Sequence, residues 1–140
     1  MKLNLRLPLY ATLLFVGVLI SACAPSVARA PAMAPLSSMP ANVQSAPQRV
    51  REAYQFAVAN PDALKNVPCY CGCGAMGHKS NLDCYLKDAS AAVFDEHALG
   101  CSICVDITGD VMRLTREGRA PPDIRATVMA AYARFGPSNQ

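Results

Sequence analysis

The sequence has no tryptophan, and only 6% of its 140 residues are aromatic. Charged residues are also scarce, 13 basic and 10 acidic, and they form neither a basic stripe nor a run of one sign. Proteins that bind nucleic acid neutralise phosphates with clustered Lys and Arg, so this pattern argues against nucleic acid as a partner. A small domain with few large aromatic side chains has a modest core, which disulfides or metal ligation could supplement.

Strand patterns and catalytic motifs are also missing from the sequence. No segment alternates apolar and polar residues over the length of a strand, and there is no internal repeat. We find neither a nucleophile–base–acid arrangement nor a phosphate-binding glycine loop, so we expect a protein that is not an enzyme. The expected fold class is all-α, a small bundle of three to four short helices around a loop rich in cysteine and glycine.

The N-terminal segment, residues 1–22, has the features of a bacterial lipoprotein signal peptide. Lys2 and Arg6 precede an almost wholly apolar run over residues 7–20, which is too short to span a bilayer comfortably. The run ends in Ile-Ser-Ala-Cys, where small residues suit a peptidase groove and the cysteine thiolate can be alkylated by a lipid donor. We therefore predict lipidation at Cys23, which would anchor the protein to a membrane of the cell envelope on its extracytoplasmic side.

A segment rich in Ala, Pro and Ser follows the cleavage site and runs to residue 47. It contains five prolines, no aromatic residue and no apolar periodicity. Such a composition is typical of an extended, disordered linker. We predict that residues 23–47 are a lipidated cysteine and a tether, and that residues 48–140 form the working domain.

Apolar periodicity and capping residues divide the domain into helices. Helices are predicted over residues 49–60, 81–94, 101–117 and 122–135. Pro61 stops the first helix, and Gly118 is a natural C-terminal cap for the third. The helix over residues 81–94 rests on a capping-box variant formed by Ser80 and Asp83. Residues 69–79 contain three glycines and are expected to be irregular.

The most informative stretch is Pro-Cys-Tyr-Cys-Gly-Cys at residues 68–73. Alternate side chains of an extended segment face the same way, so its three sulfurs would lie on one side, and Gly72 allows a curled backbone. Cysteines two residues apart make strained disulfides with each other, so each sulfur needs another partner or a shared metal. The candidate metal ligands are Cys69, Cys71, Cys73, Cys84, Cys101 and Cys104, with His78 as a possible extra.

A Cys-x-x-Cys at residues 101–104 adds two thiols at the start of a predicted helix. The spacing of three would place both on one side, and the free amides of a helix N-terminus lower a thiol pKa. His97, four residues before Cys101, is either a further ligand or a helix cap that bridges to Asp95. Met76 could supply a thioether.

Sulfur ligands at this density suit Cu(I), Zn(II) or iron–sulfur clusters. The iron–sulfur spacings are not met, and a c-type haem would need histidine where Val105 stands. Zinc sites commonly use two Cys-x₂₋₄-Cys knuckles, of which only one is clear, so Cu(I) is favoured and structural zinc is kept as an alternative. Two further alternatives remain open: three structural disulfides formed in an oxidising compartment, or a thiol redox centre at Cys101 and Cys104.

These residues resemble a bacterial lipoprotein family named for the PCYCGC motif. The resemblance rests on residues 68–73, His78, Asp83-Cys84-Tyr85, and residues 101–104 followed by Asp106, and it covers about residues 50–135. The family's function is largely unassigned, so the resemblance implies no activity. From the ligand types we expect a membrane-tethered Cu(I)-binding protein that captures, buffers or delivers the ion. A metal donor or acceptor protein is its possible partner.

Overall fold

The structure is a computed structural model that describes residues 30–140. The predicted signal peptide and the predicted lipidation site at Cys23 lie outside the described residues. In chain order the elements are η1 (Leu36–Ser38), α2 (Ala41–Gln44), α3 (Gln48–Ala59), α4 (Pro61–Leu64), η2 (Cys73–Met76), η3 (Leu82–Cys84), β1 (Leu86–Asp88), β2 (Val93–Phe94), α5 (His97–Gly100), α6 (Ser102–Arg116), α7 (Pro121–Tyr132) and η4 (Ala133–Phe135). None of the helices within residues 30–140 has the length and apolar character needed to cross a membrane.

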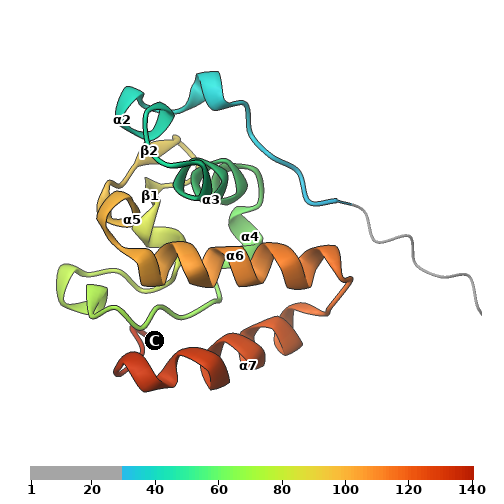
Figure 1. Ribbon diagram of the computed structural model, residues 1–140. Coiled ribbons are helices and arrows are strands. Elements are labelled where there is room, and N and C mark those ends of the chain that lie inside the picture. The colour runs from blue at the N-terminus through green and yellow to red at the C-terminus, as the bar shows by residue number, and fades with distance from the viewer. Residues whose placement is uncertain (1–29) are drawn as a thin grey trace, which may run out of the picture.

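Three longer helices form the body of the fold, and α6 lies between α3 and α7 (Figure 1). α3 and α6 bury residues spaced by three and four, and α7 buries residues spaced by four, which are the patterns that place side chains on one face. Phe56 of α3 and Ile107 and Val111 of α6 are fully buried, and Val128 of α7 is 1% exposed. The predicted all-α bundle is correct in that the protein is mostly helical and wrong in that β1 and β2 form a small sheet; three of the four predicted helices are present with slightly shifted ends.

The end of α6 follows the predicted capping chemistry. Gly118 has φ of 74°, in the left-handed region that glycine adopts without a steric penalty. The amide of Arg119 donates to the carbonyl of Leu114, and that of Gly118 donates to the carbonyl of Thr115, both at 3.0 Å. These bonds satisfy carbonyls that the end of a helix would otherwise leave without partners, and they turn the chain back towards α7.

The helix predicted over residues 81–94 is wrong. Only Leu82–Cys84 is helical there, and β1 and β2 form a two-stranded antiparallel hairpin with an irregular register. The carboxylate of Asp88 accepts the amides of Ser90 and Ala91 at 2.8 and 3.2 Å, so a local turn replaces helical hydrogen bonding. Ala92 completes the turn with φ of 51°. The capping contact between Ser80 and Asp83 is present, since the Asp83 carboxylate accepts the Ser80 amide at 3.1 Å, but the helix after it ends within a single 3₁₀ turn.

The prediction that residues 23–47 form a disordered tether is wrong over residues 34–46. Met39 and Val43 are 4% and 2% exposed and belong to the apolar core. Ala34 exchanges hydrogen bonds with Gln55 of α3, as donor at 3.0 Å and as acceptor at 2.7 Å. Prolines begin the short helices of this segment instead of keeping it extended, because proline is tolerated where an amide has no helical partner. The folded unit therefore begins earlier than predicted.

Candidate metal centre

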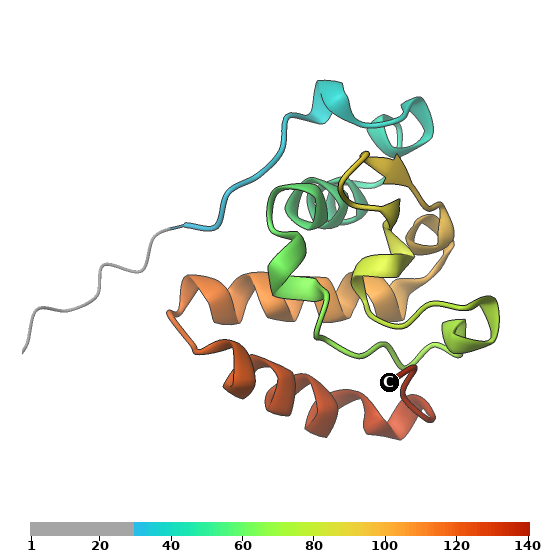
Figure 2. The ribbon, with the colours of Figure 1, turned by 180° about the vertical axis from the view of Figure 1, so that it is seen from behind.

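The loop that carries the three closely spaced cysteines runs beneath the first turns of α6 and beside the C-terminus (Figure 2). Cys69 and Cys73 are almost fully buried, whereas Cys71 is half-buried. Gly72 has φ of 83°, and η2 starts directly after it. A side chain at position 72 would be strained at this φ, so glycine permits the curl that turns the third cysteine back towards the first two.

Five sulfurs gather around this loop from three separate parts of the chain. The Sγ of Cys69 lies 3.4 Å from that of Cys71 and 3.5 Å from that of Cys104, and the Cys71 and Cys104 sulfurs are also 3.5 Å apart. The Sγ of Cys84 lies 3.7 Å from that of Cys73. Cys69 and Cys71 each contact two other sulfurs, which is the arrangement of ligands around a shared ion and differs from isolated pairs.

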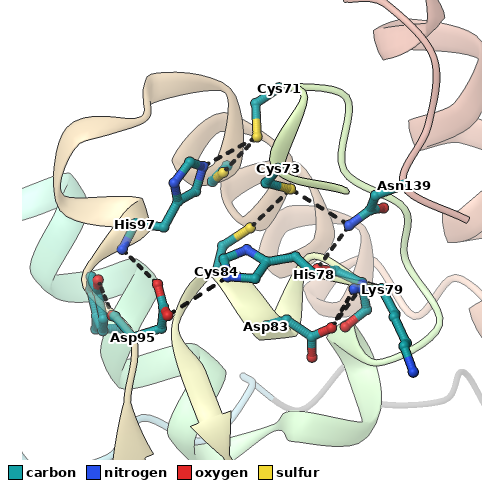
Figure 3. A network of polar contacts seen from close by, with 12 residues as sticks. Cys71, Cys73, His78, Lys79, Asp83, Cys84, Asp95, His97 and Asn139 are labelled. Carbon is teal, nitrogen blue, oxygen red and sulfur yellow. Dashed lines mark hydrogen bonds and ion pairs between the residues drawn. The ribbon is translucent and has the colours of Figure 1, made fainter. Parts of the chain in front are cut away.

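His97 at the start of α5 completes the cluster. Its Nε2 lies 3.3 Å from the Sγ of Cys71, and its backbone amide donates to the Oδ1 of Asp95 at 2.8 Å (Figure 3). Two sets of four potential ligands have all their donor atoms within 4.8 Å of one another. One set is Cys69, Cys71, Cys73 and Cys84, and the other is Cys71, Cys84, His97 and Cys104.

His78, the extra ligand proposed from the sequence, lies beside the cluster and belongs to neither set. Its Nε2 is 3.6 Å from the Oδ2 of Asp95, and its ring meets that of His97 edge to face with centroids 5.4 Å apart. Its Nδ1 is buried and has no hydrogen-bond partner. His78 therefore packs against the His97 ring at the edge of the cluster.

Cys101 is the predicted ligand that the structure leaves apart from the cluster. It is the N-cap of α6, with extended φ and ψ of −119° and 102°, while Cys104 lies inside the first turn. The rule that residues three apart share a helix face holds only when both are helical, so Cys104 points into the cluster and Cys101 does not. Cys101 is half-buried and lines a shallow surface hollow with Leu99 and Val105.

Residues that are not ligands hold the sulfurs in place. The Oδ1 of Asn139 accepts the amide of Cys69 at 2.7 Å, and its Nδ2 donates to the Sγ of Cys73 at 3.6 Å and to the carbonyl of Ser80 at 3.3 Å. Partners of this kind orient ligands and tune their basicity. Nothing in the sequence pointed to Asn139, because it lies 66 residues beyond Cys73 and its role depends on where the chain end packs.

A buried polar network fixes the backbone behind Cys104. The hydroxyl of Tyr85 donates to the Cys104 carbonyl at 2.9 Å, and the Nδ2 of Asn81 donates to the same oxygen at 3.3 Å. The Oγ1 of Thr108 lies 2.7 Å from the Oδ1 of Asn81 and 2.8 Å from the Tyr85 hydroxyl. All three side chains are completely buried, and Tyr85 and Asn81 hold the first turn of α6 through the Cys104 carbonyl.

The thiols strongly influence one another's ionisation. Hydrogen bonds with the Cys104 and Cys84 thiols lower the pKa of Cys69. Burial raises the pKa of Cys71 and of Cys73. The hydrogen bond with Cys69, then the one with Cys84 and burial, raise the pKa of Cys104. One thiolate at Cys69 is thus stabilised by neighbouring thiols that stay protonated, and a soft cation could replace those protons.

A family model described as "Protein of unknown function with PCYCGC motif" matches residues 31–137. The chain belongs to this family. The match confirms the resemblance drawn from the motif, and it starts close to where the folded unit begins in the structure. No curated protein and no solved structure matched the chain.

In this member of the PCYCGC family, the motif supplies three of the five clustered sulfurs. The other two come from Cys84 and Cys104, and both are completely buried. The described cysteines are all free thiols. The family motif therefore forms one wall of a Cys- and His-rich cluster that could hold a metal ion.

Proposed function

We propose that the protein is a membrane-anchored lipoprotein that binds Cu(I) through the thiolate cluster and captures, buffers or delivers the ion at the cell envelope. The observation that carries the proposal is the convergence of five sulfurs and one imidazole nitrogen in two overlapping sets of four, within each of which all donor atoms lie within 4.8 Å of one another. Thiolates are soft ligands that favour Cu(I), and a set of more than four donors allows the ion to exchange by swapping one ligand at a time.

The position of His97 supports exchange with a partner. His97 lines a surface hollow together with Met76, His78 and Asp95, and Met76 is 57% exposed at its edge. The Met76 thioether, the His97 imidazole and the buried thiolates form a series of ligands of decreasing solvent exposure. An incoming ion would therefore meet the exposed thioether first and the buried thiolates last.

The cluster is tested by loading the reduced full chain with Cu(I) under anaerobic conditions, followed by alkylation of free thiols and peptide mass spectrometry. Bound Cu(I) is expected to protect the five clustered cysteines and to leave Cys101 reactive. Cys101→Ser is the matched control, since it removes a half-buried thiol outside the cluster and should leave metal binding unchanged. A chain that binds no metal and forms three disulfides would refute the proposal and favour the disulfide alternative.

Structural zinc is a second candidate, favoured by the mutual spacing of Cys69, Cys71 and Cys104. Their sulfurs are 3.4 to 3.5 Å apart, close to the separation of thiolates around one tetrahedral Zn(II), which binds sulfur at about 2.3 Å. Competition decides between the two: Cu(I) should displace Zn(II) from the loaded chain. Retention of Zn(II) against excess Cu(I) would favour the structural role.

The membrane anchor is tested separately from the metal centre. The wild-type chain produced in a bacterial cell should incorporate a labelled fatty acid and sediment with membranes. A Cys23→Ala variant should lose the label. Equal labelling of the variant would contradict lipidation at this residue, without bearing on the metal centre.

A further inference from the structure

The two sets of potential ligands overlap in an informative way. They share Cys71 and Cys84, and each set adds two donors that the other lacks. Cys73 belongs only to one set and His97 only to the other. Cys69 and Cys104, one from each set, also lie against each other with sulfurs 3.5 Å apart, so the donors at the two ends of the cluster are Cys73 and His97.

Six donor atoms exceed what one ion uses. Zn(II) in a structural site takes four ligands, and a site built for one ion would leave two of these donors without a metal. Yet both end donors are held against the cluster (Figure 3). The Sγ of Cys73 is 3.7 Å from that of Cys84 and accepts an N–H of Asn139, while the Nε2 of His97 is 3.3 Å from the Sγ of Cys71.

Charge also bears on how many ions a fully ionised cluster would hold. Among residues 30–140, no hydrogen bond joins a Lys or Arg side chain to the clustered sulfurs, so protein cations do not balance thiolate charge there. If all five thiols ionise, one Cu(I) leaves four uncompensated negative charges in a mostly buried site and two Cu(I) ions leave three, and unpaired buried charge is costly. A second cation reduces this excess, and a bridging thiolate shares its negative charge between two ions.

We propose that the cluster is a dinuclear centre in which the thiolates of Cys71 and Cys84 bridge two soft metal ions. Cys69 and Cys73 complete one ion's ligands, and His97 and Cys104 complete the other's. Each ion replaces the protons of the thiols that bind it, and those protons pass to solvent, so loading involves no change of oxidation state. The inference rests on the proposed function in requiring that the cluster bind metal, and it adds the number of ions and the ligands of each.

The competing arrangement is one ion at the centre of the cluster, held by Cys69, Cys71, Cys84 and Cys104. In that arrangement Cys73 and His97 are not ligands. Removing either would then leave the number of bound ions unchanged. The end donors therefore distinguish the two arrangements.

The test uses the reduced full chain saturated anaerobically with Cu(I) and weighed by native mass spectrometry. Wild type should carry two ions, Cys73→Ser should carry one, and His97→Gln should carry one. Cys101→Ser, the control outside the cluster, should carry two. Circular dichroism checks that each variant is folded. His97 is only half-buried, so His97→Gln is expected to fold and is the variant that decides the test if Cys73→Ser unfolds.

The outcomes separate this inference from the proposed function. A single ion in saturated wild type would overturn the dinuclear centre and leave the proposed function intact, whereas no bound ion would refute both. Two ions that persist in both end variants would overturn the assigned ligands. X-ray absorption of the doubly loaded chain should show a nearby copper scatterer around each copper, and its absence would contradict thiolate bridging.

Discussion

The buried network behind Cys104 makes Thr108→Val the most informative single substitution. The change keeps the β-branched shape and nearly the same helix propensity, and it removes one hydroxyl from a completely buried position. It leaves the Oδ1 of Asn81 buried without a partner, because that oxygen is 2.7 Å from the Thr108 hydroxyl. An unsatisfied buried acceptor costs about 1–3 kcal/mol, which corresponds to a fall in Tm of roughly 4 °C or more in the metal-free, reduced chain.

Thr115→Val is the matched control on the same helix. The Oγ1 of Thr115 is buried and has no hydrogen-bond partner, so its removal leaves no new unpaired group and should be neutral or slightly stabilising. Urea unfolding followed by circular dichroism measures both variants. Equal losses of stability, or an unchanged Thr108→Val, would refute the view that the network holds α6. Thr108→Val should also weaken metal binding, because the network positions the backbone of Cys104.

Three further predictions concern the N-terminal segment, the chain end and pH. Met39→Ala should lower the free energy of unfolding, measured with urea, by about 2–5 kcal/mol, because Met39 is only 4% exposed. Met33 is 41% exposed, so Met33→Ala should lower it by less than about 0.5 kcal/mol. Equal losses in the two variants would contradict a packed N-terminal segment. Asn139→Ala should lower stability by about 1–3 kcal/mol and weaken metal binding in competition with a chelator, because it frees the Cys69 amide. Burial raises the pKa of Cys71 and Cys73, so both thiols are protonated near neutral pH and must lose their protons to bind metal. The affinity for the metal ion should therefore rise roughly tenfold per pH unit for each proton displaced. A metal affinity that does not change between about pH 6 and 8 would contradict this.

The longer helices could be predicted from sequence because each has a strong local signal. The apolar spacing of three and four predicted residues 49–60, 101–117 and 122–135, and the structure places helices at Gln48–Ala59, Ser102–Arg116 and Pro121–Tyr132. Local signals failed where tertiary contacts decide. Leu86 is 4% exposed in a hairpin that stands where a helix was expected, and the hairpin is held to α3 by the Tyr54 hydroxyl, which donates to the Asp95 carbonyl at 2.7 Å.

The sequence predicted the kind of ligands at the candidate site better than it predicted which individual residues lie there. Crowded cysteines predicted a cluster, and five of the six proposed sulfurs are in it. The choice of histidine depended on three-dimensional placement: His78 lies closest to the motif in sequence, yet it is His97 that contacts Cys71, since the hairpin and α5 bring it back over the loop. Cys101 lies outside both sets of donors, because the prediction from its Cys-x-x-Cys spacing assumed that the helix had already begun, whereas Cys101 is the N-cap of α6.

The way the cluster joins the core bears on whether a metal would be structural or exchangeable. Cys69, Cys84 and Cys104 are completely buried, and thiols in such places pack as small apolar groups. The large buried side chains Phe56 and Ile107 join α3 and α6 through contacts that need no metal. A core joined in this way is expected to stay folded when an ion is lost and the thiols are reprotonated, in contrast to small zinc domains whose folding energy comes from the metal. Four of the clustered cysteines are themselves members of this apolar core, so loss of an ion would leave them packed as small apolar groups, which is compatible with a protein that buffers or delivers metal.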